Sequence, residues 1–191
     1  MRIIGGRWAD TPLVSPSGRV RPTSEVLREA WMTELGDQLK GTRILDLFAG
    51  SGALGFEAAS RGARSVTMVD THTPVIRQLD TIKGKLKADA VTLVRGDALT
   101  TGAGMALRGQ RYDLVFLDPP YNQDFLAKSL PLCAKLLKPG GLVYAESGAP
   151  LPFEPEDGSP APDWLGPWEA IRADKAGIVF YHLLKLQSNP A

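Results

Sequence analysis

Residues 43–62, RILDLFAGSGALGFEAASRG, carry the strongest fold signal in this chain of 191 residues. The apolar run over residues 43–48 predicts a buried strand, and the glycines that follow it predict a tight turn. Residues 53–62 then have the composition of a helix that ends at Gly62. A strand, a glycine turn and a helix in this order predict the first unit of an open α/β sheet. Ligands of such sheets lie beyond the carboxyl ends of the strands.

The same alternation continues through the rest of the chain. It predicts further strands over 65–70, 90–97, 112–118 and 141–147, helices over 74–87 and 126–137, and a loop with a short helix over 100–109. Two last strands, near 168–173 and over 175–186, are expected to pair as an antiparallel hairpin, which is common at the edge of a parallel sheet. The expected fold is therefore α/β, with a doubly wound, mostly parallel, seven-stranded sheet.

The segment before the first strand has a different character. It predicts a hairpin with strands 2–8 and 11–14 around Ala9-Asp10, a basic loop over 15–22, and a helix over about 25–39. We divide the chain into residues 1–24, the hairpin and basic loop, and residues 25–191, the sheet domain. Because the glycine turn begins only at residue 49, we expect removal of residues 1–22 to leave ligand binding at that turn intact.

Composition excludes several classes of protein. No apolar run approaches the roughly 18 residues that a membrane span needs, and the N-terminus does not read as a secretory signal. We therefore expect a cytoplasmic monomer that has no membrane contact. Cys133 is the only cysteine and lies in an apolar helical pattern, which predicts a buried thiol. With one cysteine and two distant histidines there is no zinc spacing, so we expect no metal.

Charge is almost balanced overall but is polarised along the chain. The net formal charge is +1. Residues 1–22 hold four arginines and one acid, for a net charge of +3, whereas residues 146–170 hold six acids and no Lys or Arg, for −6. The positive end therefore lies at the N-terminus, where it could contact phosphates of a nucleic acid.

The ends of the first three predicted strands carry groups that suit a nucleotide-like cofactor. The turn after the first strand matches G-x-G-x-x-G, which allows close approach of a ligand to the backbone. Asp70, about 20 residues further on, could accept hydrogen bonds from ribose hydroxyls, and Asp97 could accept one from an adenine amino group. Taken alone, these features do not separate NAD from S-adenosyl-L-methionine (SAM). A ligand-free tight turn and solvated acids at the strand ends also remain open.

The end of the fourth strand separates the two cofactors. It reads Asp118-Pro119-Pro120-Tyr121, and two prolines stiffen the turn because each fixes its φ angle. The loop would thus hold the Asp118 carboxylate and the Pro119 carbonyl as two acceptors for the two N–H groups of an exocyclic amine. Tyr121 would offer a flat face to a base. These residues favour transfer of a methyl group from SAM over hydride transfer, although a proline turn with a capping Asp is the simpler alternative.

With these motifs in place, the chain resembles the amino-methyltransferases that carry D-P-P-Y. More narrowly, it resembles the bacterial 16S rRNA (guanine(966)-N(2))-methyltransferase family. The similarity covers nearly the whole chain and is carried by RIIGG at 2–6, RPT at 21–23 with Arg28-Glu29, LDLFAGSGALGFEAASRGA at 45–63, DPPY at 118–121, and KAG at 175–177 with Tyr181.

The resemblance implies a Rossmann-like class I SAM-dependent methyltransferase with an N-terminal β-hairpin extension. Its substrate would be guanine N2 of 16S rRNA, as free RNA or in the small ribosomal subunit. The implied cofactor contacts are Asp46, Phe48, Ala49, Gly50, Ser51, Gly52, Asp70, Asp97 and Ala98. The implied catalytic residues are Asp118, Pro119, Pro120 and Tyr121. The implied RNA contacts are Arg2, Arg7, Arg19, Arg21, Thr23 and Arg28.

Some positions depart from the pattern of that family. Asp70 replaces the usual Glu, and Ala9-Asp10-Thr11 replaces a Lys-Gly-Arg turn, so the hairpin loses positive charge. The alternatives are an amino-methyltransferase that acts on a DNA base or a protein glutamine, an NAD-dependent oxidoreductase, and a non-catalytic RNA-binding module. The oxidoreductase leaves the DPPY motif unexplained, and a glutamine methylase would prefer Asn in place of Asp118.

Overall fold

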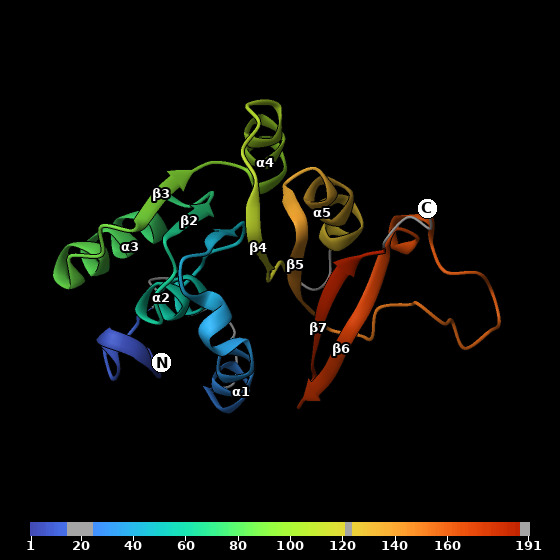
Figure 1. The fold of residues 1–191 in the computed structure, drawn as a ribbon, viewed down its shortest axis with the longest axis horizontal. Helices are drawn as coiled ribbons and strands as arrows, with labels where there is room; N and C mark the ends of the chain where they lie inside the picture. The colour runs from blue at the N-terminus through green and yellow to red at the C-terminus, as the bar shows by residue number, and fades with distance from the viewer. Residues whose placement is uncertain (15–24, 121–123, 188–191) are drawn as a thin grey trace.

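The computed structural model describes residues 1–14, 25–120 and 124–187, and its centre is one seven-stranded sheet (Figure 1). The strand order is β3-β2-β1-β4-β5-β7-β6. The first five strands are parallel, and β7 runs antiparallel to both β5 and β6. The strands are β1 Arg43–Asp46, β2 Ser65–Asp70, β3 Val91–Arg95, β4 Tyr112–Leu117, β5 Leu137–Ser147, β6 Trp168–Ala176 and β7 Val179–Leu186. The predicted fold class is therefore confirmed.

Helices cover both faces of this sheet and bury two apolar clusters. The helices are α1 Glu25–Leu35, α2 Ala53–Ser60, α3 Thr73–Leu86, α4 Ala98–Leu107 and α5 Phe125–Ala134, with 3₁₀ turns η1 Gly6–Trp8, η2 Gly36–Leu39 and η3 Asp163–Leu165. Helices α1, α2 and α3 pack on one face, and α4 and α5 pack on the other. Because both faces are covered, the central strands are nearly continuous apolar runs, as parallel strands usually are.

Several element boundaries differ from the prediction; for example, the helix predicted over 126–137 ends at Ala134. Strand β5 begins at Leu137 rather than at residue 141, since Leu137 pairs with Tyr112 before a register shift in the ladder. The predicted last strand over 175–186 is divided by a turn at Gly177, whose φ of 58° favours glycine. Lys175 and Ala176 therefore belong to β6, and β7 starts two residues after that turn.

The N-terminal hairpin is present in a shorter form than predicted. Its two segments run antiparallel, with Ile3 N–H donating to Thr11 O at 2.9 Å and Asp10 N–H donating to Ile3 O at 2.8 Å. They form a single bridge, Arg2 to Pro12, because the 3₁₀ turn η1 replaces the end of the first predicted strand. This turn lies against α2: a Cβ placed on Gly6 would come within 2.1 Å of the Ser60 carbonyl oxygen.

The acidic, proline-rich segment between β5 and β6 is a loop, as predicted, and it is fixed at several points. The imidazole of His182 holds its start, since Nε2 accepts the Leu151 N–H at 3.3 Å and Nδ1 lies 3.3 Å from Ala145 O. Burial of His182 lowers its pKa, which keeps the ring neutral and able to accept. Leu165 and Trp168 bury the other end of the loop against the α5 face.

Candidate active site at the carboxyl edge of the sheet

The glycine turn connects β1 to α2 in a conformation that requires glycine. Gly50 and Gly52 have φ of 53° and 81°, and a Cβ on Gly52 would lie 2.6 Å from Phe56 and 2.7 Å from Leu79. Ala49 N–H donates to Val69 O at 2.9 Å, which fixes the turn to β2. Ser51 is buried, and its hydroxyl lies 3.8 Å from the Met1 sulfur. The turn that the sequence predicts is thus present and held from several sides.

Asp70 stands at the end of β2 beside this turn. Its Oδ2 accepts the Gly50 N–H at 3.1 Å, and its Oδ1 accepts the His72 N–H at 3.0 Å. The side chain is 14% exposed, and each carboxylate oxygen has room for a second hydrogen bond. The Asp70 carboxylate therefore links the glycine turn to the start of α3. It also has acceptor capacity for a pair of hydroxyls.

Asp46, at the end of β1, is a buried acid at the start of the turn. Its side chain is 1% exposed, and Oδ1 has no hydrogen-bond partner among the described residues. The pKa of Asp46 is raised to about 7: burial is the largest cause, the nearby acids Asp70 and Glu146 add to the rise, and hydrogen bonds from the backbone N–H groups of Phe48 and Gly55 oppose it. A buried carboxylate of this kind favours a cationic ligand, since a positive charge nearby would stabilise its ionised form.

The other predicted cofactor contacts lie along the same edge. Asp97 follows β3 and caps α4, because its carboxylate accepts the Thr100 N–H at 2.8 Å, and this bond lowers its pKa. Ala98 is buried beneath it. Phe48 packs edge-on against Phe125, with ring centroids 5.4 Å apart. The structure therefore assigns Asp97 a structural role as a cap, which still leaves acceptor capacity on an exposed carboxylate.

The DPP segment follows β4 at the centre of the edge. Asp118 is half-buried, Pro119 is buried and Pro120 is exposed. Tyr121, the predicted stacking residue, lies outside the described residues. A cavity of about 530 Å³ opens beside the two prolines, and it is lined by Pro119, Pro120, Asp124, Leu126, Ala127, Glu146, Ser147, Gly148, Ala149, Pro150, Leu151 and Trp164.

Glu146 and Trp164 are residues of this region that sequence reasoning missed. Glu146 lies at the carboxyl end of β5, as Asp46 and Asp70 do in β1 and β2, but in the sequence it is counted only as part of the acidic segment. Applying the strand-end rule to the fifth strand, which ends Ala-Glu-Ser, would have found it. Trp164 sits in a loop far along the chain, and no local pattern places it at the cavity.

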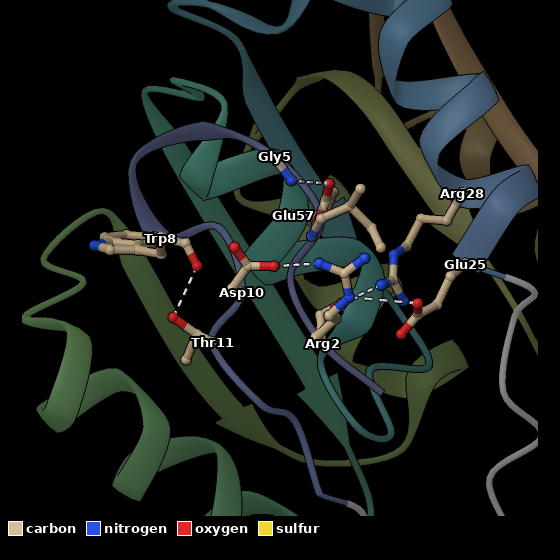
Figure 2. A network of polar contacts seen from close by, with 9 residues as sticks. Arg2, Gly5, Trp8, Asp10, Thr11, Glu25, Arg28 and Glu57 are labelled. Atoms are coloured by element: carbon tan, nitrogen blue, oxygen red, sulfur yellow. Dashed lines mark hydrogen bonds and ion pairs between the residues drawn. The ribbon is translucent and has the colours of Figure 1, made fainter.

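The N-terminal segment is anchored on α2 rather than free (Figure 2). The buried Glu57 carboxylate accepts the N–H groups of Ile4 and Gly5 at 2.8 and 3.0 Å. Ile3 and Leu13 are 0% and 3% exposed and belong to the main apolar cluster. Removal of residues 1–22 would expose core surface and take two hydrogen-bond donors from Glu57, whose remaining partner is Arg61. Because Glu57 belongs to α2, the helix that follows the glycine turn, this packing argues against the expectation that the deletion leaves ligand binding at that turn intact.

The predicted RNA contacts fall into three groups. Arg28 is 0% exposed and donates to the Arg2 carbonyl oxygen, so it is an internal residue and not a surface contact (Figure 2). Its helix faces the core at this position, and burial lowers its pKa. Arg2 is half-exposed but forms ion pairs with Asp10 and Glu25, whereas Arg7 is exposed over the Trp8 ring. Arg19, Arg21 and Thr23 lie outside the described residues.

The remaining sequence expectations concern reactive side chains, metals and membranes. Cys133 is a buried free thiol, as predicted, and burial raises its pKa. Across residues 1–14, 25–120 and 124–187, no three His, Cys, Asp or Glu side chains gather in a group that could hold a metal ion. In the same residues, no helix combines the length and apolar character needed to cross a membrane.

Comparisons with known proteins extend these observations. Residues 1–185 match the model of a family described as conserved hypothetical protein 95. The chain is 34% identical to ribosomal RNA small subunit methyltransferase D of Escherichia coli, over 98% of this chain and 91% of that protein. It is 31% identical to the protein of the same name in Haemophilus influenzae, over 96% and 92%. The solved structure of the Escherichia coli protein yhhF matches with a TM-score of 0.80 at 32% identity, over 99% of both chains.

Proposed function

The chain belongs to the conserved hypothetical protein 95 family, and from this premise we propose that it is a SAM-dependent methyltransferase of ribosomal RNA. Its proposed substrate is the exocyclic N2 of a guanine in 16S rRNA, the activity implied by the guanine(966) type of enzyme. The relatives named above, which are called ribosomal RNA small subunit methyltransferases, support the coarser part of this proposal.

One observation carries the proposal: a cofactor-like site and an amine-binding loop share one edge of the sheet. The glycine turn and Asp70 lie at the ends of β1 and β2. Asp118 and Pro119 lie at the end of β4, which pairs directly with β1. The cavity beside Pro119 and Pro120 then offers space for a flat base next to that loop. A methyl donor and an acceptor amine would therefore meet between β1 and β4.

The residues present fit SAM. The unpartnered Oδ1 of the buried Asp46 suits the positive charge of its ammonium and sulfonium groups. Asp70 has acceptor capacity for the two ribose hydroxyls, the Ala49–Gly52 turn admits close backbone contact, and Asp97 with Ala98 borders the adenine side. When bound, SAM supplies an electrophilic methyl group on sulfur.

The DPP loop would position the acceptor amine. The Asp118 carboxylate and the Pro119 carbonyl accept its two N–H groups, which directs the nitrogen lone pair toward the methyl group. Asp118 also stabilises the positive charge that develops on the nitrogen and is placed to receive the proton that the nitrogen loses. Pro119 and Pro120 hold these acceptors on a stiff turn, so little reorganisation is needed at the moment of transfer.

RNA binding is assigned to the basic N-terminal region, residues 1–24. In the described part of this region Arg2 and Arg7 are both exposed, but Arg2 is paired with Asp10 and Glu25. Arg7 is therefore the first candidate, and the proposal adds Arg19, Arg21 and Thr23 from the sequence. Lysines near the end of α3, at positions 83, 85 and 87, form a second basic surface. The six acids of residues 146–170 would repel phosphates, so the RNA backbone is expected to run on the N-terminal side of the cavity.

A reconstitution experiment tests the proposal. Small ribosomal subunits and free 16S rRNA from a strain that lacks this gene are incubated with the purified protein and methyl-labelled SAM, and modified nucleotides are mapped by mass spectrometry. We expect label in N2-methylguanine at a single position. Label at an adenine, in DNA or on a protein glutamine would replace this function by one of the alternatives. Absence of transfer to any of these substrates would contradict it altogether.

A further inference from the structure

A second carboxylate stands beside Asp118 at the edge of the sheet. The ladder between β4 and β5 ends with Leu117 paired with Ala145, so Asp118, the first residue after β4, and Glu146 come next at the same end of these adjacent strands. Glu146 is only 2% exposed, yet it is one of the residues that line the cavity beside Pro119. Burying a charged group costs free energy unless the group is paired and hydrogen-bonded. The reaction described above gives this carboxylate no task.

Glu146 is held in place by a tyrosine on the same strand. The Tyr144 hydroxyl donates to Glu146 Oε1 at 2.9 Å, and the tyrosine ring is itself fixed edge-on between Trp31 and Phe116, at 5.5 and 5.9 Å. Burial raises the pKa of Tyr144, and both Glu146 and Asp118 raise it further. The Tyr144 hydroxyl therefore stays protonated and acts as a hydrogen-bond donor to Glu146. Both carboxylates lie within electrostatic reach of this hydroxyl.

The chemistry of the bases indicates what such a pair of carboxylates could distinguish. Adenine, cytosine and guanine all carry an exocyclic amine, so acceptors at Asp118 and Pro119 alone would hold any of the three. Only guanine has a ring N–H donor, at N1, next to that amine. Adenine N1 and cytosine N3 are acceptors, whose lone pairs an ionised carboxylate repels. A carboxylate beside the amine site therefore favours guanine and disfavours the other two bases.

We propose that Glu146 selects the target base, its carboxylate accepting the N1–H of guanine while Asp118 and Pro119 hold the N2 amine. The inference rests on the proposed function and adds its specificity-determining residue. Tyr144 is then a positioning residue, because it orients Glu146 and does not itself contact the base. Reading of the base edge in this way is typical of enzymes that take a base out of its stack before modifying it.

The test replaces the target guanine by 2-aminopurine, which keeps the 2-amino group but has a bare acceptor at N1. Each base is introduced at the mapped position of 16S rRNA by ligation of a synthetic oligonucleotide, and kcat/KM is measured for the wild-type protein and for Glu146→Gln. The wild type should prefer guanine by about 5- to 150-fold, the discrimination that one well-made contact to a base edge provides. Glu146→Gln should lower the ratio of kcat/KM for guanine to kcat/KM for 2-aminopurine by at least about fivefold, because its amide N–H can donate to the bare N1.

Two further variants make the outcome specific. Glu169→Gln changes an exposed acid on β6 and should keep the wild-type preference. Tyr144→Phe removes the orienting hydroxyl and should narrow the preference in the same direction but less. Calorimetric binding of S-adenosylhomocysteine and thermal unfolding establish that each variant is folded. If Glu146→Gln does not fold, Tyr144→Phe provides the test.

The possible failures are distinguishable. A wild-type protein that methylates no guanine in 16S rRNA contradicts the proposed function. A wild type that methylates guanine, combined with an unchanged guanine to 2-aminopurine ratio in the folded variants, overturns only the role of Glu146. A general loss of rate for both bases, with the ratio preserved, overturns that role as well, since it would mark Glu146 as structural.

Discussion

The two halves of the carboxyl edge are organised differently. On the half formed by β1, β2 and β3, acids are tied to backbone groups nearby: Asp70 accepts the Gly50 N–H, and Asp97 caps its own helix. On the half formed by β4 and β5, a side chain holds another side chain, as Tyr144 holds Glu146, and the cavity wall comes from a distant loop. We call the half formed by β1, β2 and β3 the cofactor half, and the half formed by β4 and β5 the base half. Changes of backbone conformation or charge should therefore weaken cofactor binding at the first, and loss of a single side chain should impair handling of the base at the second.

The largest effect is expected on the base half. Asp118→Ala removes an acceptor that acts on the reacting amine, so kcat should fall by about 100-fold or more, the usual loss when one electrostatic contact to a transition state is removed. Binding of S-adenosylhomocysteine, measured by calorimetry, should stay within about twofold of wild type because Asp70 and the glycine turn are untouched. A parallel loss of cofactor binding would show that the two halves are not separable.

The reciprocal change is Asp70→Ala on the cofactor half. It removes the proposed ribose acceptor and frees the Gly50 N–H, so SAM binding should weaken by about 1.5–3 kcal/mol. The guanine to 2-aminopurine ratio should remain unchanged. Asp80→Ala, which removes an exposed acid on α3, is the matched control and should bind SAM normally. Equal affinities for the two variants would make Asp70 a purely structural acid.

Gly52→Ala tests whether backbone conformation controls the cofactor half. The φ of 81° and the close approach of Phe56 and Leu79 leave no room for a methyl group, so unfolding free energy should fall by about 1–3 kcal/mol. Gly84→Ala lies inside α3 with nothing within 4 Å of the added carbon and should stabilise by about 0.5–1 kcal/mol. Chemical denaturation of both variants measures the contrast. Equal changes in unfolding free energy for the two variants would show that the conformation of the turn does not require glycine at position 52.

Asp46 predicts a pH dependence that belongs to the cofactor half alone. Its pKa of about 7 means that the acid is mostly neutral at pH 6 and ionised at pH 8. Because the ionised form attracts the cationic cofactor, SAM should bind about tenfold more weakly at pH 6 than at pH 8. Asp46→Asn should bind weakly at both values and lose this dependence. If SAM affinity of the Asp46→Asn variant still changes about tenfold between pH 6 and pH 8, another group causes the pH dependence.

The same raised pKa has a consequence for stability. An acid whose pKa is higher in the folded state stabilises the fold at low pH, and this contribution is lost as the pH rises from about 4 towards 7. At pH 8 and without cofactor, the Asp46→Asn variant should therefore have a higher melting temperature than the wild-type protein. Saturating SAM should shrink this difference, because only the ionised wild-type carboxylate gains from the bound cation.

The smallest effect concerns the N-terminal segment, which packs on α2. Arg7→Ala should lower the log–log salt dependence of RNA binding by roughly 0.7, the value for one phosphate contact on a single strand. Arg108→Ala changes an exposed arginine at the end of α4, on the other face of the sheet from the N-terminal segment, and should leave the slope unaltered. Equal slopes for the two variants would move the RNA surface elsewhere, with the lysines of α3 as the next candidates.

Sequence patterns within a few residues were sufficient to predict the strands, the glycine turn and the acids at the strand ends. The alternation of short apolar runs with helical patterns, and the glycine turn at 49–52, predicted the order of strands and helices, because each strand and turn is specified within a few residues. Strand-end position placed Asp46, Asp70, Asp97 and Asp118 on one edge, since parallel strands end on the same side of a sheet. The sheet, the turn and these four acids could therefore be predicted from the sequence.

Only the tertiary structure decided what the long-range contacts do. Arg28 looks like a surface cation in the sequence, but its helix faces the core and buries it. The N-terminal segment reads as a detachable basic arm, yet Glu57, more than 50 positions away, binds its backbone. Glu146 reads as one acid among six in the sequence, but the pairing of Leu117 with Ala145 brings the end of β5 next to the segment that begins with Asp118. Burial and pairing partners depend on which surfaces meet after folding, and no pattern of spacing within a segment records that.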